Sequence, residues 1–200
     1  MLEIKMLPSP HGFAANTYLI RSGNEYAVID PTAPYDEGLT HGKVKYILLT
    51  HTHFDHILEV DSWVKGSGAE VVISKDDRAS LSNPALNCFK LFDGTDRGYF
   101  GEVTELSDGD ILSLGDTEIK FIFTPGHTAG SGVYLCDGNA FVGDTIFEGG
   151  GFGRYDLPTG SFVMLRNSIQ QLLRLDDNTV VYPGHGDKTT IKQYKTDIGS

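Results

Sequence analysis

One cluster of ligand-type side chains restricts this chain more than any other sequence feature. An apolar run at residues 44–49 leads into a seven-residue turn, THTHFDH, that carries three imidazoles and one carboxylate within six positions. Side chains alternate along an extended chain, so His51, His53 and Asp55 should project to one side while His56 points elsewhere. One short turn can then offer two imidazoles to one metal ion and a carboxylate with an imidazole to a second. A solvated loop rich in histidine is the alternative, but unrelated surface loops seldom group four such side chains at this spacing.

Length and composition narrow the class of protein. Two hundred residues can bury an adequate core without disulfides or a structural metal, so we expect one domain over residues 1–200 and a catalytic role for any metal. The chain has 27 acidic against 16 basic residues, a formal net charge of -11 that argues against nucleic acid or an anionic membrane as partner. Cys88 and Cys136 stand far apart without CxxC spacing, as buried thiols do in a reducing compartment. With no signal segment or long apolar run, the sequence predicts a soluble cytoplasmic protein.

The first half of the chain has the pattern of a sheet with one crossover helix. Short strands separated by turn residues are predicted at 2–7, 17–22 and 26–30, and they form an antiparallel meander. Apolar residues at helical spacing predict a helix over 56–66, with Asp55 as its N-terminal cap, and a strand follows at 70–74. Aromatic residues between 75 and 102 fit either a lid over a pocket or ordinary packing under a long loop.

Three more ligand-type side chains follow predicted strands in the second half. These strands cover 103–106, 111–114, 118–124, 132–136, 140–143 and 179–182, and a helix follows Ser161 with Phe162 on its apolar face. His127, Asp144 and His185 stand just past three of these strands, each beside glycine or proline, where sites are usually built. With the first turn, the chain offers five imidazoles and two carboxylates. That is too many donors for one metal ion and suits two ions, with an aspartate able to bridge them through its two oxygens.

Taken as a set, these motifs resemble a known family. The patterns HxHxDH at 51–56, PGHT at 125–128, GDT at 143–145 and PGHG at 183–186 are similar to those of the metallo-β-lactamase superfamily, and closely to its glyoxalase II-like hydrolases. The resemblance covers nearly the whole chain and implies an α+β fold, a four-layer αβ/βα sandwich of two mixed β-sheets flanked by helices, with the site at one edge. It also implies two metal sites and a bridge: His51, His53 and His127 for the first ion, Asp55, His56 and His185 for the second, and Asp144 between them.

The activity implied by this resemblance is hydrolysis of a small-molecule thioester such as S-acylglutathione. It requires two divalent metal ions, zinc first, with iron or manganese as alternatives. Two dications about 3.5 Å apart that share a water lower its pKa enough to provide a bridging hydroxide near neutral pH. The hydroxide attacks the carbonyl, a metal ion stabilises the oxyanion, and a thiolate leaves. Asp55 and Asp144 act as ligands that orient the nucleophile, and Arg154 can bind a substrate carboxylate or pair with Asp156.

Departures from the family pattern leave several activities open. The commoner class B β-lactamases carry cysteine in the position of Asp144, so β-lactam hydrolysis is not expected. Typical glyoxalase II enzymes add a C-terminal helical domain that holds glutathione, and fifteen residues after His185 cannot form it. Persulfide dioxygenases retain most of these residues and use one iron, which His51, His127 and Asp144 would hold. A lactonase of the same fold and a non-catalytic binding protein are further alternatives, and the sequence does not define the acyl group, the metal or the oligomeric state.

Overall fold

The chain forms two six-stranded sheets, and each sheet contains strands that are consecutive in the sequence. The computed structural model describes residues 2–199. Sheet A has the order β1-β2-β3-β4-β5-β6, with strands β1 (Glu3–Leu7), β2 (Thr17–Ser22), β3 (Glu25–Ile29), β4 (Lys43–Leu48), β5 (Glu70–Ser74) and β6 (Thr104–Leu106). Sheet B has the order β12-β11-β10-β9-β8-β7, with strands β7 (Ile111–Leu114), β8 (Thr117–Phe123), β9 (Gly132–Cys136), β10 (Asn139–Gly143), β11 (Val180–Pro183) and β12 (Thr189–Thr190).

Both sheets are mixed because short hairpins and long connections alternate along the chain. In sheet A, β1, β2 and β3 pair antiparallel across short turns, as predicted, whereas β3 to β6 pair parallel. Helix α1 (Val60–Ser67) provides the crossover between β4 and β5. In sheet B, β7 to β10 pair antiparallel, and β10 pairs parallel with β11 through a connection that contains helix α4 (Phe162–Leu172). The carboxyl ends of β3, β4 and β5 therefore share one edge of sheet A, and those of β8, β10 and β11 share one edge of sheet B.

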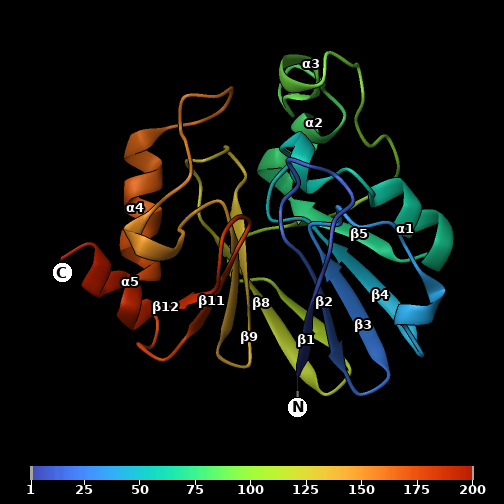
Figure 1. Ribbon diagram of the computed structural model, residues 1–200, viewed down its shortest axis with the longest axis horizontal. Coiled ribbons are helices and arrows are strands. Elements are labelled where there is room, and N and C mark those ends of the chain that lie inside the picture. The colour runs from blue at the N-terminus through green and yellow to red at the C-terminus, as the bar shows by residue number, and fades with distance from the viewer. Residues whose placement is uncertain (1, 200) are drawn as a thin grey trace.

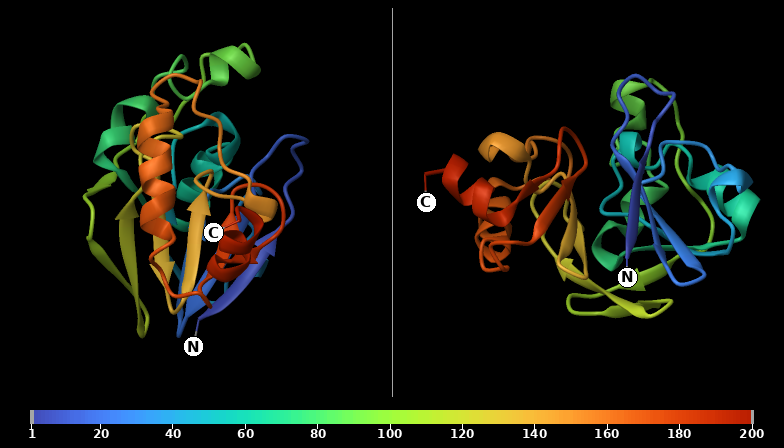
Figure 2. Two further views of the ribbon diagram at one scale, coloured as in Figure 1. Left: turned by 90° about the vertical axis from the view of Figure 1, so that its left-hand side faces the viewer. Right: turned by 60° about the horizontal axis from the view of Figure 1, so that its bottom comes forward.

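Helices cover the outer face of each sheet, which gives the molecule four layers (Figure 1). Helix α1 lies outside sheet A, whereas α4 and α5 (Ile191–Asp197) lie outside sheet B, and the two sheets face each other between them (Figure 2). The short helices α2 (Arg78–Leu81) and α3 (Phe89–Phe92) lie beyond one edge of the sandwich, at the top of Figure 1. Short 3-10 helices occur at Glu37–Leu39, Phe54–His56, Lys75–Asp77 and Glu148–Gly150. This architecture confirms the predicted αβ/βα sandwich.

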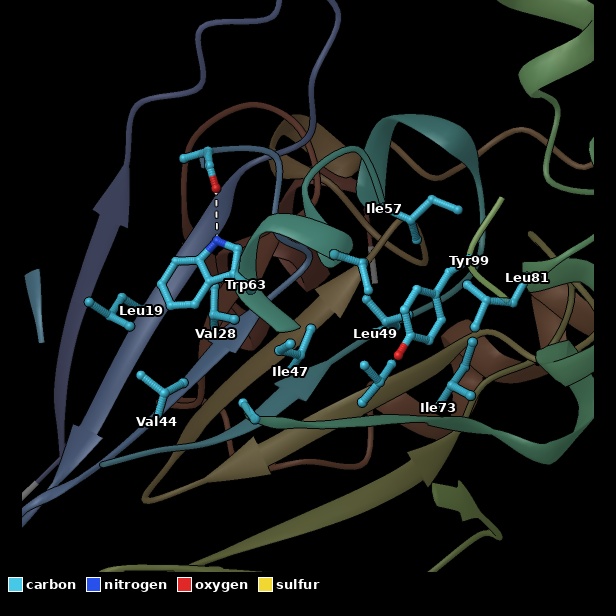
Figure 3. Packing of buried hydrophobic residues seen from close by; sticks show 14 of the residues in the cluster. Leu19, Val28, Val44, Ile47, Leu49, Ile57, Trp63, Ile73, Leu81 and Tyr99 are labelled. Atoms are coloured by element: carbon cyan, nitrogen blue, oxygen red, sulfur yellow. Dashed lines mark hydrogen bonds between the residues drawn. The ribbon is translucent and has the colours of Figure 1, made fainter. Parts of the chain in front are cut away.

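Three apolar clusters fill the spaces between the four layers. The cluster between sheet A and α1 surrounds Trp63, which is fully buried and donates its indole N–H to the Ala33 carbonyl at 2.8 Å (Figure 3). A second cluster lies between the sheets and includes Leu48 and Tyr134, and a third packs sheet B against α4 through residues such as Leu165. Central strands are buried on both faces, so their sequences are apolar runs instead of alternating patterns. Within residues 2–199, we find no helix with the length and apolar character needed to span a bilayer.

The start of the first long helix differs from its prediction. A helix was expected over 56–66, but residues 54–56 form a 3-10 turn and α1 begins at Val60, with Glu59 as the residue before it. The prediction that Asp55 caps this helix is wrong, because its carboxylate lies 3.1 Å from Nε2 of His185 instead. The Asp55 side chain is thus directed into the ligand cluster described below, and the N-terminus of α1 has no side-chain cap.

The helix after Ser161 is confirmed, with one error in its buried face. The Ser161 side chain accepts a hydrogen bond from the Met164 N–H, as an N-terminal cap does. Phe162 was predicted to face the core, but it is 47% exposed. It is the first residue of α4, and its ring packs 4.9 Å from the ring of Tyr155 outside the core. Helices α3 and α5 and strand β12 were not anticipated from the sequence.

Candidate metal centre

The histidine turn follows β4 directly, where that strand leaves sheet A. His51, His53 and His56 are 1%, 3% and 0% exposed, so the sandwich encloses all three imidazoles and the solvated-loop alternative is wrong. The backbone is extended at His53 and then turns through the 3-10 helix Phe54–His56. After this turn the ring of His56 lies 4.0 Å from that of His51, so His51 lies next to both His53 and His56.

Three turns of sheet B bring the remaining ligand-type side chains to the same place. His127 follows β8, Asp144 follows β10 and His185 follows β11. The turn before His127 depends on Gly126, which has φ of 135° and so adopts a conformation that other residues rarely reach. A side chain at Gly126 would also overlap the backbone of Leu165 in α4, so the glycine lets this turn lie directly against the helix.

Hydrogen bonds between the sheets hold the histidine turn against sheet B. The Tyr134 hydroxyl of β9 donates to the Leu49 carbonyl at 3.0 Å, and the Gly132 N–H donates to the Thr50 carbonyl at 2.9 Å. Both acceptors immediately precede His51. The two halves of the site are therefore joined through the backbone, independently of any ligand.

Six of the seven predicted side chains form two groups, and a third group of His51, His56 and Asp144 takes one member from each of them. In the first group, Nδ1 of His53 lies 2.8 Å from Nε2 of His127, and that nitrogen lies 3.1 Å from Nε2 of His51. The second group consists of Asp55, His56 and His185, with Nε2 of His185 close to the Asp55 carboxylate. In each group, the potential ligand atoms lie within 4.8 Å of one another, a spacing that could hold a metal ion.

Asp144 lies between the two groups. Its Oδ1 is 3.3 Å from Nε2 of His56, and its Oδ2 is 3.5 Å from Nε2 of His127 and 3.6 Å from Nε2 of His185. One carboxylate thus contacts a histidine of each group. This is the position that a bridging ligand requires.

Unsatisfied atoms in the cluster fit a bound cation. Nε2 of His53 is buried and has no hydrogen-bond partner among residues 2–199. Nε2 of His56 and Oδ1 of Asp144 are buried 3.3 Å apart, but their geometry is not that of a hydrogen bond and neither atom has another partner among these residues. Buried polar atoms without partners are costly, and they are rare unless they bind a water or an ion. The seven side chains supply imidazole and carboxylate donors, the set that zinc, iron and manganese accept.

The pKa shifts of His51, His53 and Asp144 fit a metal centre. Burial, followed by the charge of neighbouring imidazoles, lowers the pKa of His51 well below its ordinary value and that of His53 to about 3. Burial alone would raise the pKa of Asp144, but the imidazoles of His56, His127 and His185 lower it overall. Burial would lower the pKa of His56, but the charges of Asp144 and Asp30 raise it above its ordinary value. Neutral imidazoles and an ionised carboxylate are the forms that bind divalent cations, so His56 has to lose a proton when it binds one.

Groups behind the ligands determine which ring nitrogen His56 and His127 present. Oδ2 of Asp30 accepts from Nδ1–H of His56 at 2.8 Å, and the Arg154 carbonyl accepts from Nδ1–H of His127 at 2.7 Å. Such partners fix the tautomer and leave Nε2 free to bind a metal. Asp30 also accepts from the N–H and the hydroxyl of Thr50 at 2.8 and 2.7 Å, so its carboxylate is held in place itself.

A second buried carboxylate, Asp77, joins the two turns that carry the first group. Its Oδ2 accepts from the Thr52 N–H at 3.1 Å and from the Thr128 hydroxyl at 2.8 Å, and its Oδ1 accepts from the Gly130 N–H at 2.9 Å. Thr52 stands between His51 and His53, and Thr128 follows His127. Asp77 therefore fixes the distance between these turns, although its burial raises its pKa.

Sequence reasoning missed both buried carboxylates. Asp30 follows β3 and precedes Pro31, which is the same signal that identified Asp144, so it could have been found. Asp77 lies one residue after Asp76, which is exposed, in a 3-10 turn. Nothing in the sequence distinguishes the two neighbours, because the difference depends on which side of the turn faces the histidines.

A cavity of about 790 Å³ opens over the cluster, and its lining includes His53, Asp55, His127, Asp144 and His185. Arg154 also lines this cavity, but its guanidinium donates to both oxygens of Asp156 at 2.8 and 2.9 Å. The structure thus contains the ion pair that was one of the two predicted roles of Arg154. Binding of a substrate carboxylate by Arg154 stays a prediction.

Both expectations for the aromatic segment 75–102 apply, each to different residues. Phe92 lines the cavity and is 51% exposed, as a residue at a pocket mouth would be. Phe89 and Tyr99 are 2% and 7% exposed and belong to the core cluster beside sheet A. The segment therefore contributes to the core and to the cavity wall at once.

The sandwich fold and the His/Asp cluster at its edge together define a metal-binding protein. The family model described as "Metallo-beta-lactamase superfamily" matches residues 11–185, and the chain belongs to this superfamily. Its members are mostly metal-dependent hydrolases.

Curated relatives match over most of the chain. "Uncharacterized protein ML0493" of Mycobacterium leprae is 35% identical over 193 residues, which cover 88% of each chain. "Probable metallo-hydrolase YqgX" of Bacillus subtilis is 33% identical over 194 residues, which cover 88% of this chain and 87% of the relative. "Hydroxyacylglutathione hydrolase" of Tolumonas auensis is 31% identical over 191 residues, which cover 92% of this chain and 66% of that protein.

Solved structures share the fold over nearly its full length. The crystal structure of BLEG-1 B3 metallo-beta-lactamase has a TM-score of 0.88 and 30% identity, covering 97% of both chains. TTHA1623 in a di-iron-bound form has a TM-score of 0.81 and 28% identity, covering 94% of this chain and 96% of that one. ETHE1 from Myxococcus xanthus has a TM-score of 0.76 and 25% identity, covering 98% of this chain and 83% of that one.

Proposed function

We propose that this protein is a binuclear metal-dependent hydrolase of thioesters such as S-acylglutathione, with zinc as its metal. The observation that carries the proposal is the completeness of two ligand groups that meet at one carboxylate, Asp144. Similarity to a hydroxyacylglutathione hydrolase supports a thioester as substrate. The di-iron form of a related structure makes iron the alternative to zinc.

The residues of the chain have separate tasks in this reaction. His51, His53 and His127 would hold one ion, Asp55, His56 and His185 the other, and Asp144 both. When bound, two divalent ions supply an activated water near neutral pH and positive charge for a developing oxyanion. Asp30 keeps His56 in its orientation, and the Arg154 carbonyl does the same for His127.

The reaction balances without a further reactant. A bond forms between the oxygen of water and the carbonyl carbon, the carbon–sulfur bond breaks, and its electron pair leaves with the sulfur. The products are a carboxylate and a thiol. A thiolate is a good leaving group, so no strong general acid and no serine or cysteine nucleophile are needed.

Two comparisons support specific second candidates. ETHE1 is a persulfide dioxygenase, and His51, His127 and Asp144 would suffice to hold the single iron of such an enzyme. The similarity to a B3 metallo-β-lactamase adds a β-lactam to the substrates that require testing. Persulfide dioxygenases retain most of these residues, so the metal content and the reaction, not the presence of the second ligand group, distinguish the two candidates.

Metal analysis combined with a substrate panel tests the proposal. The protein is grown without metal supplementation and purified without a His tag. About two equivalents of zinc per chain are expected, with thioester hydrolysis that a chelator abolishes and zinc restores. About one equivalent of iron, with oxygen consumption on glutathione persulfide, would identify the dioxygenase instead. Hydrolysis of a β-lactam without hydrolysis of any thioester would identify a β-lactamase.

A further inference from the structure

The cavity over the ligand cluster is bounded mainly by apolar side chains. Besides the ligands, its lining includes Phe13, Ala14, Phe54, Phe92, Phe147 and Leu157. These residues come from the loop after β1, the histidine turn, α3 and the loops after β10. Segments far apart in the sequence thus contribute similar side chains to one wall.

The aromatic rings of this wall are arranged to hold a flat apolar group. Phe54 and Phe92 stack with ring centroids 5.3 Å apart and an interplanar angle of 21°. The ring of Phe147 lies 6.2 Å from that of His185, directly beside the ligand cluster. Offset-stacked and edge-to-face arrangements of aromatic rings are favourable at these separations, so a further ring entering the cavity can contact several partners.

Part of this apolar surface is exposed to solvent at the cavity mouth. Phe13 is 89% exposed and Phe92 is 51% exposed. Apolar area in contact with water is unfavourable, and a ligand that covers these rings gains the free energy of burying them. Exposed apolar surface around a pocket is a usual sign of a ligand-binding groove.

The same wall offers little to a charged substrate group. Among the described residues that line the cavity, Arg154 is the single lysine or arginine, and Asp156 pairs with one edge of its guanidinium, through Nε and Nη2. Glutathione carries two carboxylates and an ammonium group, which this lining does not match. The net charge of -11 further disfavours an anionic substrate.

We propose that the substrates are thioesters with an uncharged aryl group next to the reacting carbon–sulfur bond, held against the cavity wall that Phe13, Phe54 and Phe92 line. The inference rests on the proposed hydrolase function and narrows its substrate class away from S-acylglutathione with a small acyl group. The aryl group can belong to the acyl part or to the thiol part, since both are adjacent to the bond that breaks.

A panel of thioesters tests this substrate class with the zinc-loaded enzyme. Acetyl and phenylacetyl groups are each joined to N-acetylcysteamine and to glutathione, and acetyl is also joined to benzyl mercaptan. We expect one phenyl group to raise kcat/KM roughly 10- to 100-fold over the acetyl ester of N-acetylcysteamine, mostly through KM. The phenylacetyl thioesters place the phenyl group in the acyl part, and the benzyl mercaptan thioester places it in the thiol part. Comparing their kcat/KM values shows in which part of the substrate the phenyl group is recognised. Highest activity on acetyl-glutathione, with no gain from phenyl, would overturn the inference.

Binding of product-like acids separates this inference from the hydrolase assignment. 3-Phenylpropionate and propionate are compared by calorimetric titration of the zinc-loaded protein, without turnover. Tighter binding of the phenyl acid, with no thioester hydrolysed, would leave the apolar site intact and reject the proposed function. Equal binding of both acids with active hydrolysis would reject the aryl site and leave the function intact.

Two variants locate the site on the wall. Phe92→Ala is expected to lower kcat/KM for the phenyl thioester about 10-fold and to raise KM more than it lowers kcat. Phe100→Ala is the matched control, because Phe100 belongs to the same segment, is 72% exposed and does not line this cavity. The control should keep the phenyl preference. An equal loss in both variants, or none in Phe92→Ala, contradicts the placement of the aryl group.

Discussion

Two buried carboxylates, Asp30 and Asp77, support the ligand cluster from behind. Asp30 acts on one ligand directly, since it accepts from the ring N–H of His56. Asp77 touches no ligand side chain and acts through the backbone and hydroxyls of the neighbouring residues Thr52 and Thr128. The first carboxylate thus orients a ring, and the second sets the distance between two turns.

Asp77→Asn should weaken metal binding by the first ligand group. The amide places an N–H₂ where one carboxylate oxygen now accepts hydrogen bonds, so at least one donor from Thr52, Thr128 or Gly130 loses its partner. Loss of such supporting contacts typically lowers metal affinity about 10- to 100-fold. Competition titrations with a chromophoric zinc chelator would measure this for one of the two ions.

The matched control for this experiment is Asp76→Asn. Asp76 is the preceding residue, carries the same charge and is exposed. It should bind both ions as the unmodified protein does. Equal zinc affinities for the Asp77 and Asp76 variants would show that the two turns keep their spacing without the buried carboxylate.

At the scale of turns and helices, each ligand depends on the backbone that surrounds it. Gly184, next to His185, shows this dependence clearly. A Cβ at this position would overlap Oδ1 of Asp144 and Cε1 of His56, and the Gly184 N–H donates to the Gly143 carbonyl at 2.7 Å. Only hydrogen at the Cα of Gly184 lets the turns after β10 and β11 approach so closely.

Gly184→Ala should therefore remove the metal centre while most of the fold remains. The methyl group displaces Asp144, so we expect metal content and hydrolysis to fall at least roughly 10-fold, measured by elemental analysis and kcat/KM. Overpacking of this kind costs about 1–3 kcal/mol of stability. A variant with full metal content and activity would show that Asp144 is not needed where the structure places it.

Gly68→Ala is the control for Gly184→Ala, because it is also a glycine-to-alanine change but lies away from the metal centre. Gly68 ends α1 with φ of 68°, and no atom lies within 4 Å of an added Cβ. The substitution strains the backbone and should cost about 1 kcal/mol while metal content stays unchanged. Similar losses of stability in both variants, with metal lost only from Gly184→Ala, would assign the effect to the site.

The strands and the ligand positions could be predicted from the sequence, because both depend on local patterns of residues. Buried strands give apolar runs, and ligands such as His127 and Asp144 stand beside glycine or proline just past them. The 3-10 turn at residues 54–56 was not readable, because contact between Asp55 and the distant His185 stabilises it. The short helix α3 was missed for a similar reason, since burial of Phe89 in a core cluster formed by distant residues, and not helical periodicity, supports it.

At the scale of the whole molecule, the site joins the two sheets. Sheet A and its turns supply His51, His53, Asp55 and His56, and the turns of sheet B supply the other three ligands. Each ligand group contains at least one residue from each half. A metal ion held by either group would therefore connect the two halves. Such an ion would bind the folded state and not the unfolded chain, where these residues are far apart.

Removal of metal should lower the thermal stability of the whole molecule. Ligands that bind only the folded state stabilise it by about 2.7 kcal/mol when present at 100 times their Kd. For a chain of this length, each kcal/mol shifts Tm by about 2–4 °C, so a chelator should lower Tm by roughly 5–10 °C. Thermal unfolding followed by circular dichroism, with and without chelator, measures this shift.

Readdition of zinc and a ligand variant complete the test. Zinc in excess of the chelator should restore the original Tm. His127→Ala removes the one contribution of sheet B to the first group, so its chelator-dependent shift should be markedly smaller. Unfolding that is insensitive to chelator in the unmodified protein would mean that the ions do not bridge the two halves.

Because the ligands are divided between the two sheets, they are also translated at different times. Sheet A ends at residue 106, so its four donors are translated before any strand of sheet B. At that moment neither group is complete, because His127 and His185 have not yet been translated. A nascent chain therefore cannot complete either ligand group until the strands of the second sheet have been made.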